Sequence, residues 1–321
     1  MNDYSHGSSR TSDPYLKKLR QKRLASGIAV LAATAIVATV AILVISDIVA
    51  KKSVPVASQE AIVALWAEQD YQSVSAACDA SLEIKPLDPF YLSFKGFSAF
   101  YLGLSESDGE KRAARMDEAI FAIRKALIDE KAPLRAEASY VLGKAYFHKG
   151  MDYYNEAVDY IEESVSLGYS RADTWEYLAL ATQGIGMVEK SISYFEKALA
   201  GKPGSPELML AAASATATAG NSTRAEALAR EALSTTNDDY LAERCSFLLG
   251  DIYRKTGRLE EALARYEAIK TINPQSADAW YYEGLVLQES GDPIKARASW
   301  RKAISIDPMH AGARLKLSER S

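Results

Sequence analysis

The side chains that most often carry out catalysis or bind metals are few in this sequence, and their spacing suits neither task. It has three histidines, His6, His148 and His310, and no two of them stand at a spacing typical of metal ligands. The motifs HExxH, CxxC and GxSxG are absent. Adjacent carboxylates occur at Glu162–Glu163 and Glu260–Glu261, but neighbouring residues of a helix do not face each other. We therefore expect no catalytic, metal-binding or cofactor-binding residues, and a protein that is not an enzyme.

The two cysteines, Cys78 and Cys245, lie far apart in the sequence. Unpaired cysteines behave as small apolar residues and are commonly buried. We interpret both as buried free thiols. A disulfide between them is the alternative, and it would have to join distant parts of the chain.

The charge is divided unevenly along the chain. The net charge is −4, yet residues 1–52 carry roughly +5 and the remainder roughly −9. A nucleic-acid-binding protein would present a basic stripe, which an acidic body does not offer. We therefore expect no nucleic-acid partner.

A long apolar segment near the N-terminus is the first element that the sequence predicts. Residues 27–45 read GIAVLAATAIVATVAILVI, without a charge or a proline. With its flanks the segment has about twenty residues, which as a helix would span about 30 Å, the thickness of a bilayer core. We expect a transmembrane helix over residues 26–48. A cleaved signal peptide is the alternative, although its apolar region would be shorter and would end in small residues, unlike Ile48-Val49-Ala50.

The basic residues around this segment predict its orientation. Only Lys51 and Lys52 follow it closely, whereas a cluster precedes it: Lys17, Lys18, Arg20, Lys22 and Arg23. Because positive charge is retained on the cytoplasmic side, residues 1–25 are expected to form a disordered basic cytoplasmic tail. The protein is then a single-pass signal-anchored protein of the cytoplasmic (inner) membrane whose remaining residues are periplasmic. The reversed topology is the alternative.

The rest of the chain repeats one spacing of small, large and turn-forming residues. Its last copy spans residues 277–310, with Gly284 and Ala296 where two helices would cross and Gly291 in the turn between them. The full pattern of this copy is Trp280, Gly284, Leu287, Gly291, Ala296, Trp300, Ala303 and Pro308. Large residues such as Trp300 would fill the space beside the small ones, and Pro308 would end the second helix.

The same spacing recurs upstream and predicts about seven helix pairs in an all-α fold. The predicted pairs occupy residues 53–88, 89–135, 136–171, 172–205, 206–242, 243–276 and 277–310, followed by a capping helix at 311–321. The first pair is degenerate. The second fits only with about eleven residues (105–115) inserted between its helices, and the third only with about two extra residues in its turn.

This pattern resembles the tetratricopeptide repeat family over roughly residues 55–310, about four fifths of the chain. The resemblance implies a right-handed α-solenoid in which the first helix of each pair lines a concave groove that binds a peptide or a partner helix. Anchored periplasmic members of the family resemble this layout, with one membrane helix before the repeats. Members that clamp the acidic tail of chaperones carry Lys and Asn at defined groove positions; here those positions are mostly Tyr, Phe, Leu and acidic, so we do not expect that clamp.

The resemblance also implies which residues line the groove. They are Trp66, Phe90, Phe97, Phe100, Tyr101, Tyr140, Lys144, Phe147, Leu180, Leu210, Phe247, Asp251, Arg254, Tyr281 and Leu285. The N-terminal half of this set is aromatic and would favour apolar anchors of a partner. The alternative is that some of these rings pack between copies. We interpret His148, on the same side, as a solvated surface residue.

Two functions fit these expectations. The first is an adaptor or assembly factor that binds a segment of a partner protein in the groove, in envelope assembly, secretion or translocon-associated chaperoning. The second is a structural role, in which the array self-associates as a homo-oligomer or is a permanent subunit of a membrane complex.

Overall fold

The structure is a computed structural model that describes residue 39 and residues 57–319. Within these residues it holds 15 α-helices, one short 3-10 helix and no β-strand. The helices are α2 (Gln59–Ala67), α3 (Tyr71–Ile84), α4 (Pro89–Ser105), α5 (Gly109–Ala126), α6 (Arg135–Lys149), η1 (Met151–Tyr153), α7 (Tyr154–Ser166), α8 (Thr174–Gly184), α9 (Val188–Gly201), α10 (Pro206–Thr218), α11 (Ser222–Thr235), α12 (Asp239–Lys255), α13 (Leu259–Ile272), α14 (Ala277–Glu289), α15 (Pro293–Ile306) and α16 (Ala311–Ser318). The all-helical prediction is confirmed.

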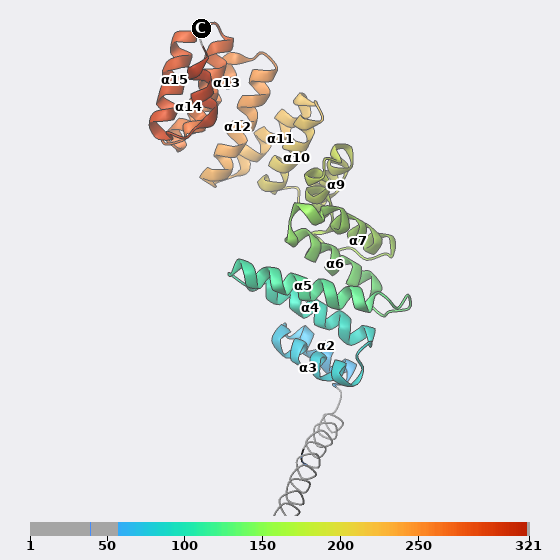
Figure 1. The fold of residues 1–321 in the computed structure, drawn as a ribbon. Helices are drawn as coiled ribbons and strands as arrows, with labels where there is room; N and C mark the ends of the chain where they lie inside the picture. Colours follow the sequence, from blue (N-terminus) through green and yellow to red (C-terminus); the bar gives the residue numbers. More distant parts are fainter. Residues whose placement is uncertain (1–38, 40–56, 320–321) are drawn as a thin grey trace, which may run out of the picture.

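The helices form one elongated stack. Each helix packs against the next along the chain, and contacts between helices further apart are few. Figure 1 shows α2 and α3 at one end of the stack and α14 and α15 at the other. Such a stack has no single central core; its apolar residues form a series of clusters along its length.

Local sequence signals begin and end these helices. The Asp292 side chain accepts a hydrogen bond from the Lys295 backbone N–H at the start of α15, and Ser276 does the same for Ala279 at the start of α14. Gly257 and Gly291 follow the ends of α12 and α14 with φ of +76° and +84°. Only glycine adopts this conformation without strain, so these positions allow the tight turn to the next helix.

Small residues let paired helices approach closely, as the repeat spacing predicts. A Cβ on Gly284 would collide with the Trp300 indole, and one on Gly250 would lie 2.7 Å from Cζ of Tyr266. Trp300 itself is buried and donates a hydrogen bond from Nε1 to the Tyr281 carbonyl at 3.1 Å. The large ring therefore occupies the space that the missing side chain leaves.

The predicted insertion between the helices of the second pair is wrong in its placement. Helix α4 continues to Ser105 and α5 already begins at Gly109, so most of residues 105–115 are helical and only 106–108 connect the two helices. Asp108 explains the early start, since its carboxylate accepts hydrogen bonds from the backbone of Glu110 and Lys111. In the third pair the extra residues form η1.

Other expectations differ from the structure or lie outside it. Helix α12 begins at Asp239, before the boundary expected at residue 243, because Asp238 caps it through the Leu241 N–H. In residues 57–319 no helix is long and apolar enough to span a bilayer. The expected membrane helix over 26–48 and the tail over 1–25 lie outside the described residues, apart from Thr39. Both cysteines are buried free thiols, as expected.

Candidate protein-binding groove

Three of the hollows along the stack are lined mostly by the first helix of each pair. The N-terminal hollow, of about 440 Å³, lies among α2, α4, α6 and the turn before α8. The central hollow, of about 530 Å³, lies among α8, α10 and α12. The C-terminal hollow, of about 570 Å³, is bounded mainly by α12 and α14, with Tyr266 from α13. Together they mark the groove face of the solenoid.

Aromatic rings line one side of the N-terminal hollow. The Trp66 ring lies 5.5 Å from the Tyr101 ring and 5.9 Å from the Phe97 ring, centroid to centroid. Tyr101 in turn stacks on Tyr71 at 4.9 Å. Trp66 and Tyr101 are half-buried, so each offers an accessible ring edge or face, whereas Phe97 is almost fully enclosed.

An ion pair set among rings also lines this hollow. The Lys144 ammonium lies 2.8 Å from the Asp173 carboxylate, and within 4.8–5.4 Å of the ring centroids of Tyr177, Tyr140 and Phe100. The Tyr140 hydroxyl donates to the same carboxylate. Burial opposes ionisation of Asp173, but the hydrogen bonds from Lys144 and Tyr140 outweigh it and lower the pKa of that carboxyl. The charges of Lys144 and Asp173 therefore pair with each other within the protein, and this pair links α6 to the turn before α8.

Arg171 lies at the rim of the N-terminal hollow. Its Nε donates to the Tyr169 hydroxyl at 2.7 Å, and its guanidinium carbon lies 5.1 Å from the centroid of the same ring. The residue is exposed. Sequence reasoning missed it because it precedes α8, whereas the repeat pattern assigns groove positions only to helices.

The structure separates the predicted groove residues into those that line a hollow and those that do not. Trp66, Phe97, Tyr101, Tyr140 and Lys144 line the N-terminal hollow, Leu180 and Leu210 the central one, and Phe247, Asp251 and Arg254 the C-terminal one. Whether they bind a partner stays a prediction.

Four aromatic residues that were predicted to line the groove line none of the three hollows. Phe100 has no exposed surface, so it cannot serve as a groove contact as predicted, and Phe90 lines none of the three hollows. Phe147 is half-buried and stacks on Tyr154, with ring centroids 4.9 Å apart. Tyr281 is half-buried beneath α16, where a Cβ on Gly312 would lie 2.7 Å from its Cζ. Leu285 packs in the same C-terminal apolar cluster. The alternative expectation, that some rings pack between copies, holds for Phe100, whose ring contacts Lys144 and His148 of α6.

His148 lies at the edge of the groove next to Tyr177. Its Nε2 is 3.0 Å from the Tyr177 hydroxyl. Desolvation, together with the nearby charges of Lys144 and Arg112, lowers the pKa of this imidazole. It is exposed, as expected, and among the described residues no group of metal-ligating side chains surrounds it or any other position.

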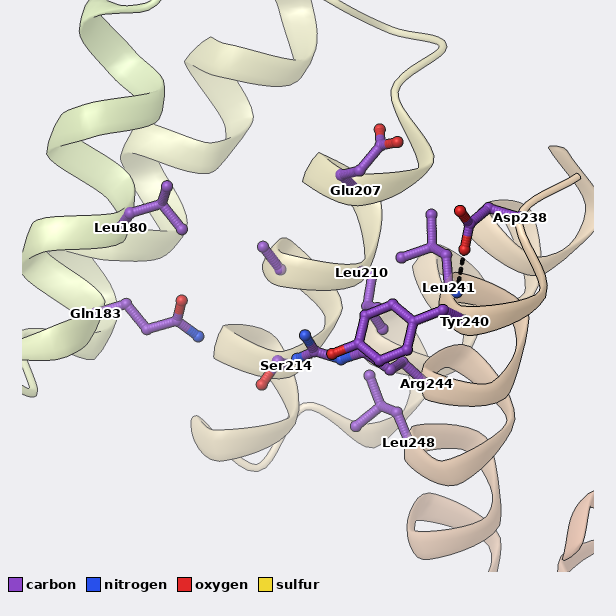
Figure 2. A pocket seen from close by; sticks show the side chains of 11 residues that line it. Leu180, Gln183, Glu207, Leu210, Ser214, Asp238, Tyr240, Leu241, Arg244 and Leu248 are labelled. Atoms are coloured by element: carbon purple, nitrogen blue, oxygen red, sulfur yellow. Dashed lines mark hydrogen bonds between the residues drawn. The ribbon is translucent and has the colours of Figure 1, made fainter. Parts of the chain in front are cut away.

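The central hollow contains two residues that sequence reasoning missed (Figure 2). Tyr240 and Arg244 project from the first turns of α12, and both are exposed. They were missed because the sixth copy was expected to begin at residue 243, which left Tyr240 in the fifth copy. In the sixth copy, groove positions were assigned only from Phe247 onward, so Arg244 was not among them. The Asp238 cap was the signal in the sequence that could have found them.

The charge in the C-terminal hollow is paired within the protein. The Arg254 guanidinium lies 3.1 Å from the Asp251 carboxylate and 2.7 Å from that of Glu289, so it bridges α12 and α14. Compared with the central hollow, this end of the groove therefore offers less free charge to a partner.

Comparison with known families identifies the repeats. A TPR repeat model matches residues 250–291, and a tetratricopeptide repeat model matches residues 277–310. Residues 250–310 of this chain therefore carry tetratricopeptide repeats. No curated protein matches the sequence.

Two solved tetratricopeptide repeat proteins are similar in fold. One is the C-terminal part of a protein from Cytophaga hutchinsonii, 16% identical, with a TM-score of 0.57 over 82% of this chain and 100% of that chain. The other is from Parabacteroides merdae, 14% identical, with a TM-score of 0.54 over 68% of this chain and 84% of that chain. At such identities the likeness concerns the fold alone.

Proposed function

We propose that this tetratricopeptide repeat protein is a membrane-anchored adaptor that binds a segment of a partner protein along its groove. The observation that carries this proposal is the N-terminal hollow. Trp66 and Tyr101 keep accessible ring surface there, against a wall held rigid by the Lys144–Asp173 pair. Accessible rings that become buried when a partner binds are the side chains that most often dominate protein binding.

The proposed location follows from residues 1–52. An uncharged apolar stretch at 27–45, with basic residues before it, supports a single membrane helix with the repeats on the periplasmic side of a cytoplasmic membrane. Such a place suits envelope assembly, secretion or translocon-associated chaperoning.

A photocrosslinking amino acid in place of Tyr101, in intact cells, tests the adaptor function. We expect a covalent adduct with a discrete partner, which the second change Trp66→Ala removes. The matched control carries the crosslinker in place of Phe121, which is 71% exposed on α5 and lines none of the three hollows. The absence of an adduct at Tyr101, or identical adducts at both positions, would contradict the proposal.

The structural alternative and the topology have their own outcomes. An adduct of twice the chain mass from Tyr101 would favour self-association. A reporter that is active only outside the cytoplasm, fused after Ser321, should be active; activity of a cytoplasmic reporter at the same site would reverse the proposed orientation.

A further inference from the structure

We propose that the central hollow binds an internal acidic side chain of the partner segment, together with an aliphatic neighbour. This inference rests on the proposed function and names the chemistry of the segment that the groove takes.

Hydrogen-bond donors without partners gather in this hollow. The Gln183 amide comes from α8, the Ser214 hydroxyl from α10, and the Tyr240 hydroxyl and Arg244 guanidinium from α12. Among the described residues none of these side-chain groups has a hydrogen bond or ion pair, although the Arg244 guanidinium lies 5.8 Å from the Tyr240 ring centroid. Figure 2 shows Gln183 pointing from α8 toward the space in front of α10, and Arg244 reaching toward Ser214.

The acidic groups of the hollow are at its rim and are already bonded. Asp238 accepts the Leu241 N–H at 2.8 Å, and Glu207 accepts the Ser205 hydroxyl at 2.8 Å. In Figure 2 their carboxylates lie at the opposite side from Gln183, Ser214 and Arg244. Both carboxylates keep their negative charge, but they lie away from the place where the unpaired donors gather around Arg244. At that place the free groups are donors with one full positive charge, which complements a carboxylate.

Leucine side chains form the apolar surface beside these donors. Leu210 and Leu241 are 7% and 8% exposed, and Leu180 and Leu248 are half-buried. An aliphatic residue next to the acidic one would cover them and exclude water from the Arg244 ion pair, which strengthens it.

The position of the hollow favours a carboxylate within the segment over one at its C-terminus. The central hollow lies between the N-terminal and C-terminal hollows along the same series of first helices. A bound segment that uses the length of the groove passes through the central hollow, so its end would lie elsewhere.

The test uses the full-length protein in detergent and a positional library of twelve-residue peptides with acetylated and amidated ends. We expect the bound peptides to be enriched in Asp or Glu at one position with Leu, Ile or Val beside it. The variant Arg244→Gln should weaken binding of the selected peptides about tenfold, because an ionic hydrogen bond is lost. Arg244→Glu should change the preference at that position to Lys or Arg. The matched control is Arg301→Gln, an exposed arginine on α15 outside the three hollows, which should bind like the wild type.

Other binding results would count against an acidic side chain in the central hollow. Binding without acidic enrichment, equal loss in Arg301→Gln, or binding only of peptides with a free C-terminal carboxylate would overturn this inference and leave the adaptor function standing. If no peptide binds, this inference fails, and if the Tyr101 crosslink is also absent, the proposed function fails as well. Circular dichroism of Arg244→Gln confirms that the variant is folded.

Discussion

At the scale of single residues, the pair of Lys144 and Asp173 contains the least exposed cationic side chain among the ion pairs of residues 57–319. The Lys144 side chain is only 7% exposed, whereas that of Asp173 is 33% exposed. Removing Asp173 would leave a buried ammonium without its counter-charge. The partner rings of Lys144 offset part of this cost but cannot replace a carboxylate.

We predict that Asp173→Ala lowers the local free energy of unfolding of α6 and α8 by about 2 kcal/mol, below the usual range for buried pairs because Asp173 is partly exposed. Hydrogen exchange of the amides in these helices measures the change. The double variant Lys144→Met/Asp173→Ala should recover much of the loss; equal losses in both variants would show that the pair is not coupled.

The same pair should make stability depend on pH. The pKa of Asp173 is lowered on folding, so its contribution is present above the unfolded value of 3.8 and is lost as the pH falls through the lower folded value. We expect the difference in α6 exchange between wild type and Asp173→Asn, after correction for intrinsic exchange rates, to shrink below about pH 3.8. A difference that is independent of pH would contradict this assignment.

The two thiols should be chemically inert in the folded protein. Burial raises the pKa of Cys78 to about 12 and that of Cys245 to about 11, so almost no thiolate is present at neutral pH. We predict that iodoacetamide labels neither cysteine at about pH 8 until guanidinium unfolds the chain, when both react. Mass spectrometry measures the labelling. Rapid labelling of either cysteine in the folded protein would mean that the apolar cluster around that cysteine opens.

At the scale of helices, close crossings depend on glycine. A Cβ on Gly143 of α6 would lie 2.8 Å from the Ala157 carbonyl oxygen and 3.0 Å from the Ile161 nitrogen of α7. Both are backbone atoms, which cannot move aside as the end of a flexible side chain can.

We predict that Gly143→Ala destabilises the α6–α7 pair by about 1–3 kcal/mol, because the two helices must separate. The control Gly109→Ala, with no heavy atom within 4 Å of the added Cβ, should change stability by less than about 0.5 kcal/mol. Thermal unfolding followed by circular dichroism compares the two. If Gly143→Ala leaves the stability unchanged, α6 and α7 cross less closely than in the structure.

At the scale of the whole molecule, stability is local because each helix contacts mainly its neighbours along the chain. Trp300, 3% exposed and seated at Gly284, holds the last pair together. We predict that Trp300→Ala speeds amide exchange in α14, α15 and α16, by the equivalent of about 3–5 kcal/mol, and leaves α2–α5 unchanged. Faster exchange throughout the stack would instead indicate one cooperative unit.

The helix pairs could be predicted from the sequence because their signals are local. The spacing of Gly284, Gly291 and Trp300 acts within one pair, through a close crossing, a tight turn and a ring that fills a gap. These requirements recur in most copies and do not depend on the distant chain. The charge and hydropathy of residues 1–52 likewise make the membrane prediction independent of the fold, and it stays a prediction.

Only the tertiary structure decided which side chains are accessible to a partner. Phe100 and Tyr101 are adjacent and were predicted alike, yet the first is enclosed by neighbouring helices and the second keeps exposed surface. Their difference depends on where α6 and the turn at Asp173 pack, which no pattern within one copy specifies. The same holds for Arg244 and Gln183, which share a hollow only because α8, α10 and α12 stack side by side. Repeat spacing reports contacts within a pair, whereas a binding surface is made between pairs, by residues far apart in the chain.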